Sequence, residues 1–232
     1  LRAAWSVVPS ARTWSLAAWE TSALVTRCRA EGTTLQAALN TAFARALADL
    51  GSAAPATIAV PADLRRTLSP SPGEALGLYA TTLLNTVDGA ALSTYWETAR
   101  DAYADIRRRL RLEELLPFVR VYRLLPFLPR ATVSKALWRS ESEQARFDLS
   151  LSTMRPGIPS RYGPLCLEAV HCLAHTSLSG APLITAIRKD GRLFFGAVST
   201  DGQRTAELCA HAMSHLRQAV TAALWPSPSG GR

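Results

Sequence analysis

The segment GTTLQAALNTAFARALADLG, residues 32–51, carries a helix pattern with a start signal and a stop signal at its two ends. Thr33 precedes Gln36 by three residues, so their side chains can cap the first turn reciprocally, and Gly51 can end the helix. The spacing of three and four residues between apolar positions places them on one helix face. That face comprises Leu35, Ala38, Leu39, Ala42, Phe43, Ala46, Leu47 and Leu50. We therefore expect a buried amphipathic helix here, with an earlier helix at residues 21–30 packed against it.

The residues that follow this helix predict a strand at residues 57–66, which ends in the polar sequence Asp63-Leu64-Arg65-Arg66. Side chains two residues apart on a strand or at its end share one face, so Asp63 and Arg65 can pair with each other or with Glu and Arg residues nearby. For Arg65, a structural ion pair and a contact to a cofactor phosphate are alternative roles. We therefore treat Asp63 and Arg65 as candidate site residues.

The rest of the chain alternates between strand and helix patterns. Asp190-Gly191 is a hairpin signal between two strands, and prolines within residues 111–130 exclude one continuous helix there. That apolar segment fits helical pieces packed over a core, or a surface that contacts a membrane or lines an acyl channel. Strands are predicted at residues 76–87, 147–153, 165–175, 183–188 and 193–199, and helices at residues 93–110 and 205–225. This alternation predicts an α/β fold, with a mixed sheet covered by helices on one side.

The composition is that of a folded protein with a basic surface. The chain has 232 residues, of which 48% are apolar, and a formal net charge of +8. No apolar run approaches the roughly 20 residues that span a bilayer, and the four scattered cysteines fit reduced thiols in the cytoplasm.

The positive charge is concentrated in residues 100–146, which hold eleven basic and six acidic residues. Within this segment, Arg107, Arg108 and Arg109 are candidates for contact with a phosphate of a carrier or cofactor. No zinc-finger spacing, basic aromatic sheet or helix-turn-helix pattern accompanies the charge, which argues against nucleic acid as a partner. A phosphopantetheine group, an acidic carrier protein or a membrane surface fits the charge better.

No histidine or serine of this chain stands in the sequence pattern of a known type of catalytic centre. His171 and His175 are predicted on one strand, where residues four apart stand about 13 Å from each other, too far to share a metal. His211 and His215 are four apart on a helix, which permits a shared metal, but no third ligand is near them in the sequence. Residues 177–180 lack the nucleophile-elbow pattern, and no glycine-rich phosphate loop occurs. We therefore predict no metal site and no catalytic residue on this chain.

The order of four motifs resembles the C-terminal half of the condensation-domain superfamily. These motifs are EGTTLQAAL at residues 31–39, VPADLRR at 60–66, LGLY at 76–79 and DGRL at 190–193. Within the superfamily the chain is most similar to polyketide-associated acyltransferases of the phthiocerol dimycocerosyl transferase type. It is more distantly similar to wax ester synthases and alcohol acetyltransferases. The resemblance extends over about residues 20–222.

This resemblance implies one lobe of a chloramphenicol-acetyltransferase-like fold, which has two lobes and a tunnel between them. It implies acyl transfer to an alcohol from a thioester of CoA or of an acyl carrier protein, with that thioester as substrate and no tightly bound cofactor. In such families the general base is the second histidine of a His-His-x-x-x-Asp motif in the first lobe, and this sequence contains no such motif.

Three positions carry further implications of the resemblance. Asp63 and Arg65 match a pair that supports the active site across the two lobes. Thr153 stands where the family has the asparagine of a Ser-Asn pair near the tunnel, so Ser152 receives no catalytic role.

We therefore expect three parts: a linker from a missing N-terminal lobe at residues 1–20, a C-terminal acyltransferase lobe at residues 21–225, and a disordered tail at residues 226–232. The expected partners are the missing lobe or a partner chain and an acyl carrier protein or CoA, with peripheral membrane contact as a further option. Alternatives are a non-catalytic module that binds a carrier protein or a partner, and a lobe of a peptide-synthetase condensation domain. A lone lobe should expose an apolar face and therefore dimerise or aggregate.

Overall fold

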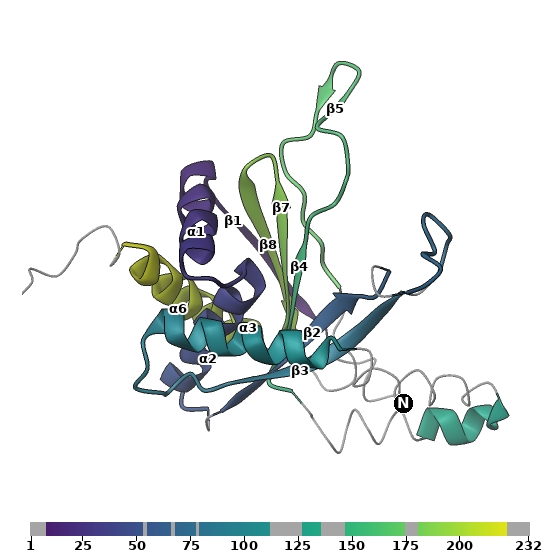
Figure 1. Ribbon diagram of the computed structural model, residues 1–232, viewed down its shortest axis with the longest axis horizontal. Helices are drawn as coiled ribbons and strands as arrows, with labels where there is room; N and C mark the ends of the chain where they lie inside the picture. The colour runs from purple at the N-terminus through teal and green to yellow at the C-terminus, as the bar shows by residue number, and fades with distance from the viewer. Residues whose placement is uncertain are drawn as a thin grey trace, which may run out of the picture.

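The computed structural model describes residues 8–52, 55–65, 68–77, 79–111, 127–135, 147–174 and 181–221. At its centre is a six-stranded mixed sheet with the strand order β1-β8-β7-β4-β2-β3 (Figure 1). Strand β4 runs parallel to β2 and to β7, and the remaining neighbours are antiparallel. The strands are β1 (Ser10–Leu16), β2 (Ala56–Asp63), β3 (Ala80–Val87), β4 (Leu149–Met154), β7 (Leu183–Lys189) and β8 (Arg192–Ser199).

Four helices cover one face of this sheet, as Figure 1 shows. They are α1 (Ala18–Ala30), α2 (Leu35–Asp49), α3 (Tyr95–Arg109) and α6 (Gly202–Thr221). A separate pair of two-residue strands, β5 (Arg161–Tyr162) and β6 (Leu165–Cys166), forms an arm that projects from the body. The predicted α/β class, with a mixed sheet under helices, is confirmed.

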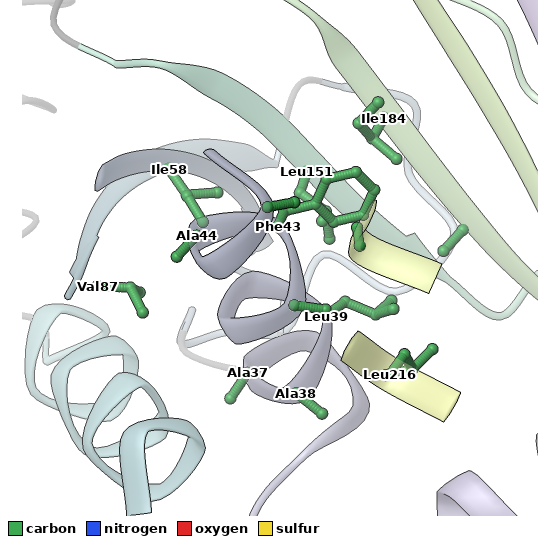
Figure 2. Close-up of a cluster of buried hydrophobic side chains, with 14 of the residues drawn as sticks. Ala37, Ala38, Leu39, Phe43, Ala44, Ile58, Val87, Leu151, Ile184 and Leu216 are labelled. Carbon is green, nitrogen blue, oxygen red and sulfur yellow. The ribbon is translucent and has the colours of Figure 1, made fainter. Parts of the chain in front are cut away.

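The hydrophobic core lies around α2, which packs against α3, against α6 and against the sheet. Figure 2 shows Phe43 beside Leu151 of β4, while Leu39 lies toward Leu216 of α6. All four side chains are at most 2% exposed. Burying a Leu or Phe side chain of this kind stabilises a fold by about 1.5–3 kcal/mol, so the predicted apolar face of this helix organises the domain.

The start of α2 differs from the predicted cap. Its N-cap is Thr34, whose hydroxyl accepts a hydrogen bond from the Ala37 amide at 3.3 Å. Thr33 instead donates to the Ala99 carbonyl oxygen of α3 at 2.9 Å, and Gln36 contacts β4. The predicted reciprocal cap is therefore wrong, because tertiary partners take both side chains.

The predicted hairpin and the predicted end of α2 are confirmed. Asp190 and Gly191 both have positive φ, of 47° and 75°, which a two-residue turn between twisted strands requires and which glycine adopts without strain. Gly51 likewise has φ of 77° after the last turn of α2. Both positions show turn chemistry that was readable from sequence.

Several strand boundaries differ from the predictions. Strand β2 ends at Asp63, β3 begins at Ala80, and the strand predicted at residues 165–175 is wrong beyond Cys166. Within the predicted linker at residues 1–20, residues 10–16 form β1, which pairs with β8 along its whole length. The sequence analysis missed this edge strand because its short, mixed pattern shows no clear alternation.

Other predictions lie partly outside the described residues. Residues 112–126, His175 and the predicted tail at residues 226–232 are among these, and the helix predicted to Trp225 is described as far as Thr221. The helix predicted at residues 93–110 is confirmed as α3 (Tyr95–Arg109), whose N-cap is Thr94. Within the described ranges, no helix has the length and apolar character needed to cross a membrane.

Candidate functional site

The carboxyl ends of the parallel strands β2, β4 and β7 lie at one edge of the sheet, which we call the strand-end edge. Ligands in open α/β sheets bind at this kind of edge. Strands β2 and β4 pair only through Ile58 with Leu149 and Ala59 with Ser150. Beyond these residues the pairing stops, so residues 60–63 and 151–154 approach the strand-end edge as separate strands. We call this the ladder break.

The side chain of Gln36 takes the place of the missing strand along β4. Its Nε2 donates to the Leu151 carbonyl oxygen at 3.1 Å, and its Oε1 accepts from the Thr153 amide at 3.1 Å. The Ser150 amide bonds to Pro182 on the β7 side, so the alternation along the strand turns Leu151 and Thr153 toward β2. A parallel neighbour would bond to these same two groups. Gln36 therefore satisfies the open side of β4 at the ladder break.

From Gln36, a chain of side-chain hydrogen bonds runs through the interior to α3. Gln36 Nε2 donates to Asn40 Oδ1 at 2.8 Å, and Asn40 Nδ2 donates to Asn85 Oδ1 at 2.7 Å. Asn85 Nδ2 then donates to Asp105 Oδ2 at 2.9 Å. At the other end, Thr153 Oγ1 donates to Gln36 Oε1 at 2.8 Å. We call Thr153, Gln36, Asn40, Asn85 and Asp105 the polar relay.

The relay is anchored in the core and ends in a charge. Asn40 and Asn85 are 0% exposed, and a buried amide without partners is costly. Burial of Asp105 raises the pKa of its carboxyl, but hydrogen bonds from Asn85, Arg108 and Arg109 outweigh burial and hold that pKa below its ordinary value. The relay therefore ends in a carboxylate that is ionised at neutral pH.

Asp63 is the last residue of β2 and Arg65 lies just beyond it, at the strand-end edge. Arg65 Nη1 lies 3.3 Å from Asp63 Oδ2, and the Arg65 amide donates to Asp63 Oδ1 at 2.9 Å. The Arg65 guanidinium also lies 5.1 Å from the centre of the Tyr79 ring. The predicted pairing is therefore confirmed, and both side chains are solvent-exposed. Their role in supporting a second lobe stays a prediction.

The three arginines at the end of α3 have different surroundings. Arg108 and Arg109 both bind Asp105, with Arg109 Nε 3.0 Å from Oδ2. Arg107 instead lies over the Tyr103 ring at 5.8 Å and is exposed. A phosphate contact by all three arginines stays a prediction, with Arg107 the least constrained of the three.

The two histidines of α6 share one aspartate. Asp49, at the end of α2, accepts hydrogen bonds from His215 Nε2 at 2.7 Å and from His211 Nδ1 at 3.1 Å. The sequence analysis missed this third residue, which is distant in sequence. His171 lies outside any strand, with Nδ1 2.8 Å from the Phe195 carbonyl oxygen. Across the described ranges, no three His, Cys, Asp or Glu side chains are placed to hold a metal ion.

The cysteines of this chain are free thiols, as predicted. Burial raises the pKa of Cys28 and of Cys209 to about 12. Both thiols therefore stay protonated at neutral pH and are poor nucleophiles. Cys166 is exposed and Cys172 is half-buried.

Large apolar side chains are exposed on the projecting arm and on α1. Tyr162 and Leu165 pair across the arm and are 52% and 69% exposed, and Trp19 is 74% exposed. Trp19 also lines an apolar pocket of about 160 Å³ between α1 and α6. Exposed apolar surface of this kind supports association with a partner, although the predicted self-association stays a prediction.

The sequence analysis named Thr153 but missed the remaining members of the relay. A signal was present in α2, because Gln36 and Asn40 are polar, lie four residues apart and sit among alanines and leucines. Such a pair lies on one side of a helix. Their partners Asn85 and Asp105 are far away in the sequence, so no local pattern joins them.

Comparisons with solved structures identify the fold. The chain is similar to the epimerization domain from the third module of tyrocidine synthetase B, with a TM-score of 0.65, 14% identity, and coverage of 93% of this chain and 48% of that one. It is similar to a structure that describes condensation-domain-mediated chain release from the enacyloxin polyketide synthase. There the TM-score is 0.63 and the identity 15%, with coverage of 97% of this chain and 44% of that one. It is also similar to polyketide synthase associated protein 5 from Mycobacterium tuberculosis, with a TM-score of 0.61, 14% identity, and coverage of 91% of this chain and 53% of that one. No protein-family model matches the sequence, and no curated protein matches it at a significant level.

These likenesses show the class of fold. The chain has the fold of one lobe of the condensation-domain, chloramphenicol-acetyltransferase-like architecture, as predicted. It spans about half the length of each of these three structures. At 14–15% identity the likeness shows a shared fold, and a shared fold alone does not define an activity.

Proposed function

We propose that this chain is the C-terminal lobe of an acyltransferase that moves an acyl group from a CoA or carrier-protein thioester to an alcohol. The observation that carries this proposal is the ladder break at the strand-end edge. There, the half-buried Gln36 side chain bonds to the side of β4 that β2 leaves unpaired, at an edge where α/β sheets bind ligands. The likeness to a structure of condensation-domain-mediated chain release supports acyl transfer as the class of chemistry.

In this proposal the reaction needs a base that lies on a second lobe. A histidine of a His-His-x-x-x-Asp motif there removes the proton of the alcohol as its oxygen attacks the thioester carbonyl carbon. The carbon–sulfur bond then breaks, and the thiolate leaves and takes up the proton. This chain contributes one wall of the site, the Asp63–Arg65 pair at the strand-end edge, and a positive surface for the donor's phosphate at Arg107, Arg108 and Arg109.

The product of the whole gene that contains this sequence provides the test. Incubated with an acyl-CoA and an alcohol, it should yield free CoA and an ester, which mass spectrometry detects. Replacing the second histidine of the motif with alanine should abolish both products. An amine acceptor in a parallel reaction distinguishes ester from amide formation. A gene product without a His-His-x-x-x-Asp motif, or without thioester turnover, would contradict the proposal.

The Asp63–Arg65 pair has a matched control on the same chain. Asp63→Asn should lower turnover because it weakens the link to Arg65. Asp88→Asn changes a carboxylate with the same local role, since Asp88 also accepts an amide two residues later, at 3.1 Å. Equal effects of the two substitutions would remove Asp63 from the site.

The second candidate function is a non-catalytic module that binds an acidic carrier protein. It is favoured by Arg107, which is exposed beside the Tyr103 ring and has no carboxylate within ion-pair distance among the residues described. Carrier binding without turnover would support it, provided that Arg107→Glu abolishes the binding and Arg29→Glu on α1, also an exposed arginine, does not.

A further inference from the structure

The direction of the polar relay is fixed by its charged end. A carboxylate only accepts hydrogen bonds, so Asn85 must turn its Nδ2 toward Asp105 Oδ2. Asn85 Oδ1 is then the acceptor for Asn40 Nδ2, and Asn40 Oδ1 is the acceptor for Gln36 Nε2. Flipping any one of these amides would place two N–H groups or two oxygens against each other. The ionised Asp105 and the Ala102 carbonyl oxygen, to which Asn85 Nδ2 also donates at 3.2 Å, orient Asn85. The β4 backbone orients Gln36 in the same direction, so all three amides have one consistent orientation.

The same direction determines what Thr153 can do. Gln36 presents Oε1 to Thr153, so the Thr153 hydroxyl must donate its only hydrogen to that oxygen. The lone pairs of Thr153 Oγ1 remain for another partner. Chains of hydrogen bonds that run in one direction polarise each other, and an anion at the far end strengthens this effect. Thr153 Oγ1 is therefore prepared to accept a hydrogen bond and cannot donate one to a ligand.

The position of Thr153 makes this property relevant to binding. The residue is half-buried at the end of β4, on the side that β2 leaves at the ladder break. Buried carboxamides such as Asn40 and Asn85 are often no more stabilising than apolar side chains of the same shape. Apolar side chains could therefore hold α2 against β4 equally well, without a five-residue relay through the core. Besides satisfying the open side of β4 through Gln36, the relay fixes the orientation of the Thr153 hydroxyl.

We propose that Thr153 Oγ1 binds a neutral N–H or O–H donor of a ligand at the ladder break, and that Gln36, Asn40, Asn85 and Asp105 are positioning residues that orient it. The identity of the ligand rests on the proposed acyl transfer. Its donor is either an amide N–H of a pantetheine arm or the hydroxyl of the acceptor alcohol. The orientation of the hydroxyl itself does not depend on that function.

The first experiment tests the relay without any ligand. Asn40→Leu with Asn85→Leu removes the middle of the relay while it keeps the side-chain shapes. In the full chain, NMR hydrogen exchange at the Thr153 amide should become at least about tenfold faster, because Gln36 loses its anchor. Thr205→Val is the control, since it removes another buried side-chain bond, to Ser199, and should leave Thr153 unchanged. Unchanged exchange at Thr153 in the double variant would overturn the relay.

The second experiment tests the ligand. Pantetheine and a simple alcohol are titrated separately into the full chain while the Thr153 amide signal is followed. A shift with pantetheine assigns the donor to the thioester arm, and a shift with the alcohol assigns it to the acceptor. Thr153→Val should weaken that binding at least about tenfold, whereas Thr153→Ser should restore it, because only serine keeps the hydroxyl. No shift with either probe, or equal binding by the valine variant, would overturn the proposed contact.

The two experiments fail independently of the proposed reaction. An inactive gene product would contradict acyl transfer, while the exchange result would still decide whether the relay orients Thr153. Conversely, an active enzyme whose Thr153→Val variant binds pantetheine and alcohol normally would keep the reaction and exclude this contact.

Discussion

Helix α2 has two neighbouring helices, and the two interfaces are built from different chemistry. Against α6, the buried part of the contact is apolar and includes Leu39 and Leu216, each at most 2% exposed, while Asp49 bonds to His211 and His215 at the surface. Against α3, buried hydrogen bonds accompany the apolar contacts: Thr33 donates to Ala99, and Tyr95 donates to Ala38 at 2.6 Å. The relay also runs from α2 through Asn85 of β3 to Asp105 of α3. The first interface supplies stability and tolerates small shifts. The second fixes position, because each buried polar group needs its own partner.

The apolar interface should show the largest loss of stability. Leu216→Ala leaves a cavity between α6 and α2, and such changes cost about 2–5 kcal/mol in the free energy of unfolding. Urea denaturation measures this loss. Leu92→Ala is the control, because Leu92 is fully exposed and its truncation should stay within about 0.5 kcal/mol. A similar result for both variants would contradict the assignment of the α2–α6 contact as the main apolar interface.

At the polar interface, a double substitution should destabilise the fold no more than a single substitution does. Asn85→Leu leaves Asn40 Nδ2 without an acceptor in the core and removes one donor from Asp105, so it should cost about 1–3 kcal/mol. Adding Asn40→Leu removes the unpaired amide. The double variant should therefore be no less stable than the single variant, and urea denaturation of the four proteins of the double-mutant cycle measures this coupling.

Additive losses of stability in that cycle would mean that the two interfaces respond in the same way. If the double variant lost the sum of both single effects, the relay would stabilise the fold in proportion to its contacts, as the apolar interface does. The positioning role would then have no thermodynamic support. A matched cycle of Leu39→Ala with Leu216→Ala shows how an apolar pair behaves.

The pH dependence should distinguish the charged end of the relay. Asp105 has a pKa below its ordinary value of 3.8 in the folded protein. Its stabilising contribution is therefore fully present above that ordinary value and is lost as the pH falls through the lower folded value. The wild type should exceed Asp105→Asn by about 1 kcal/mol at neutral pH, and this difference should shrink below about pH 4. A difference that stays constant between pH 7 and pH 3 would show that the charge is not involved.

The contrast between the two interfaces also explains what the sequence could reveal. The apolar face of α2 repeats every three or four residues, so local spacing predicted it, and Asp190-Gly191 predicted the β7–β8 turn in the same way. The polar relay joins residues that lie 45 and 117 positions apart. No local rule connects Gln36 with Thr153, and the three-residue spacing from Thr33 to Gln36 even suggested a different partner.

For the candidate site, the same limit applies with one exception. Asp63 and Arg65 are two residues apart, so their pairing could be predicted as one option, and it is observed although Arg65 lies beyond the end of β2. Thr153 was noted as a departure from a family pattern, yet its hydroxyl partner could not be inferred. Edge strand β1 was missed because its place beside β8 depends on the rest of the sheet. Positions set by tertiary contacts were thus missed, whereas positions set by chain-local geometry were found.

The smallest expected effect concerns Asp49, which also joins two elements through side-chain hydrogen bonds but lies at the surface. Burial raises the pKa of Asp49, yet hydrogen bonds from His215 and His211 outweigh burial and lower it, as happens for Asp105. Its contribution should therefore also disappear as the pH falls below the ordinary value of 3.8. Because its side chain is 40% exposed, water screens these contacts, and Asp49→Asn should cost only a few tenths of a kcal/mol.

Salt separates the two aspartates more sharply than pH does. Raising sodium chloride to about 1 M shortens the screening length to about 3 Å and should remove most of the Asp49 difference. The Asp105 difference should persist, since its side chain is 14% exposed and its partner Asn85 is buried and uncharged. Urea denaturation of both Asp→Asn variants at low and high salt measures this. If salt removed both differences equally, Asp105 would behave as a surface ion pair with Arg108 and Arg109, and the relay would lack the charged anchor that orients its amides.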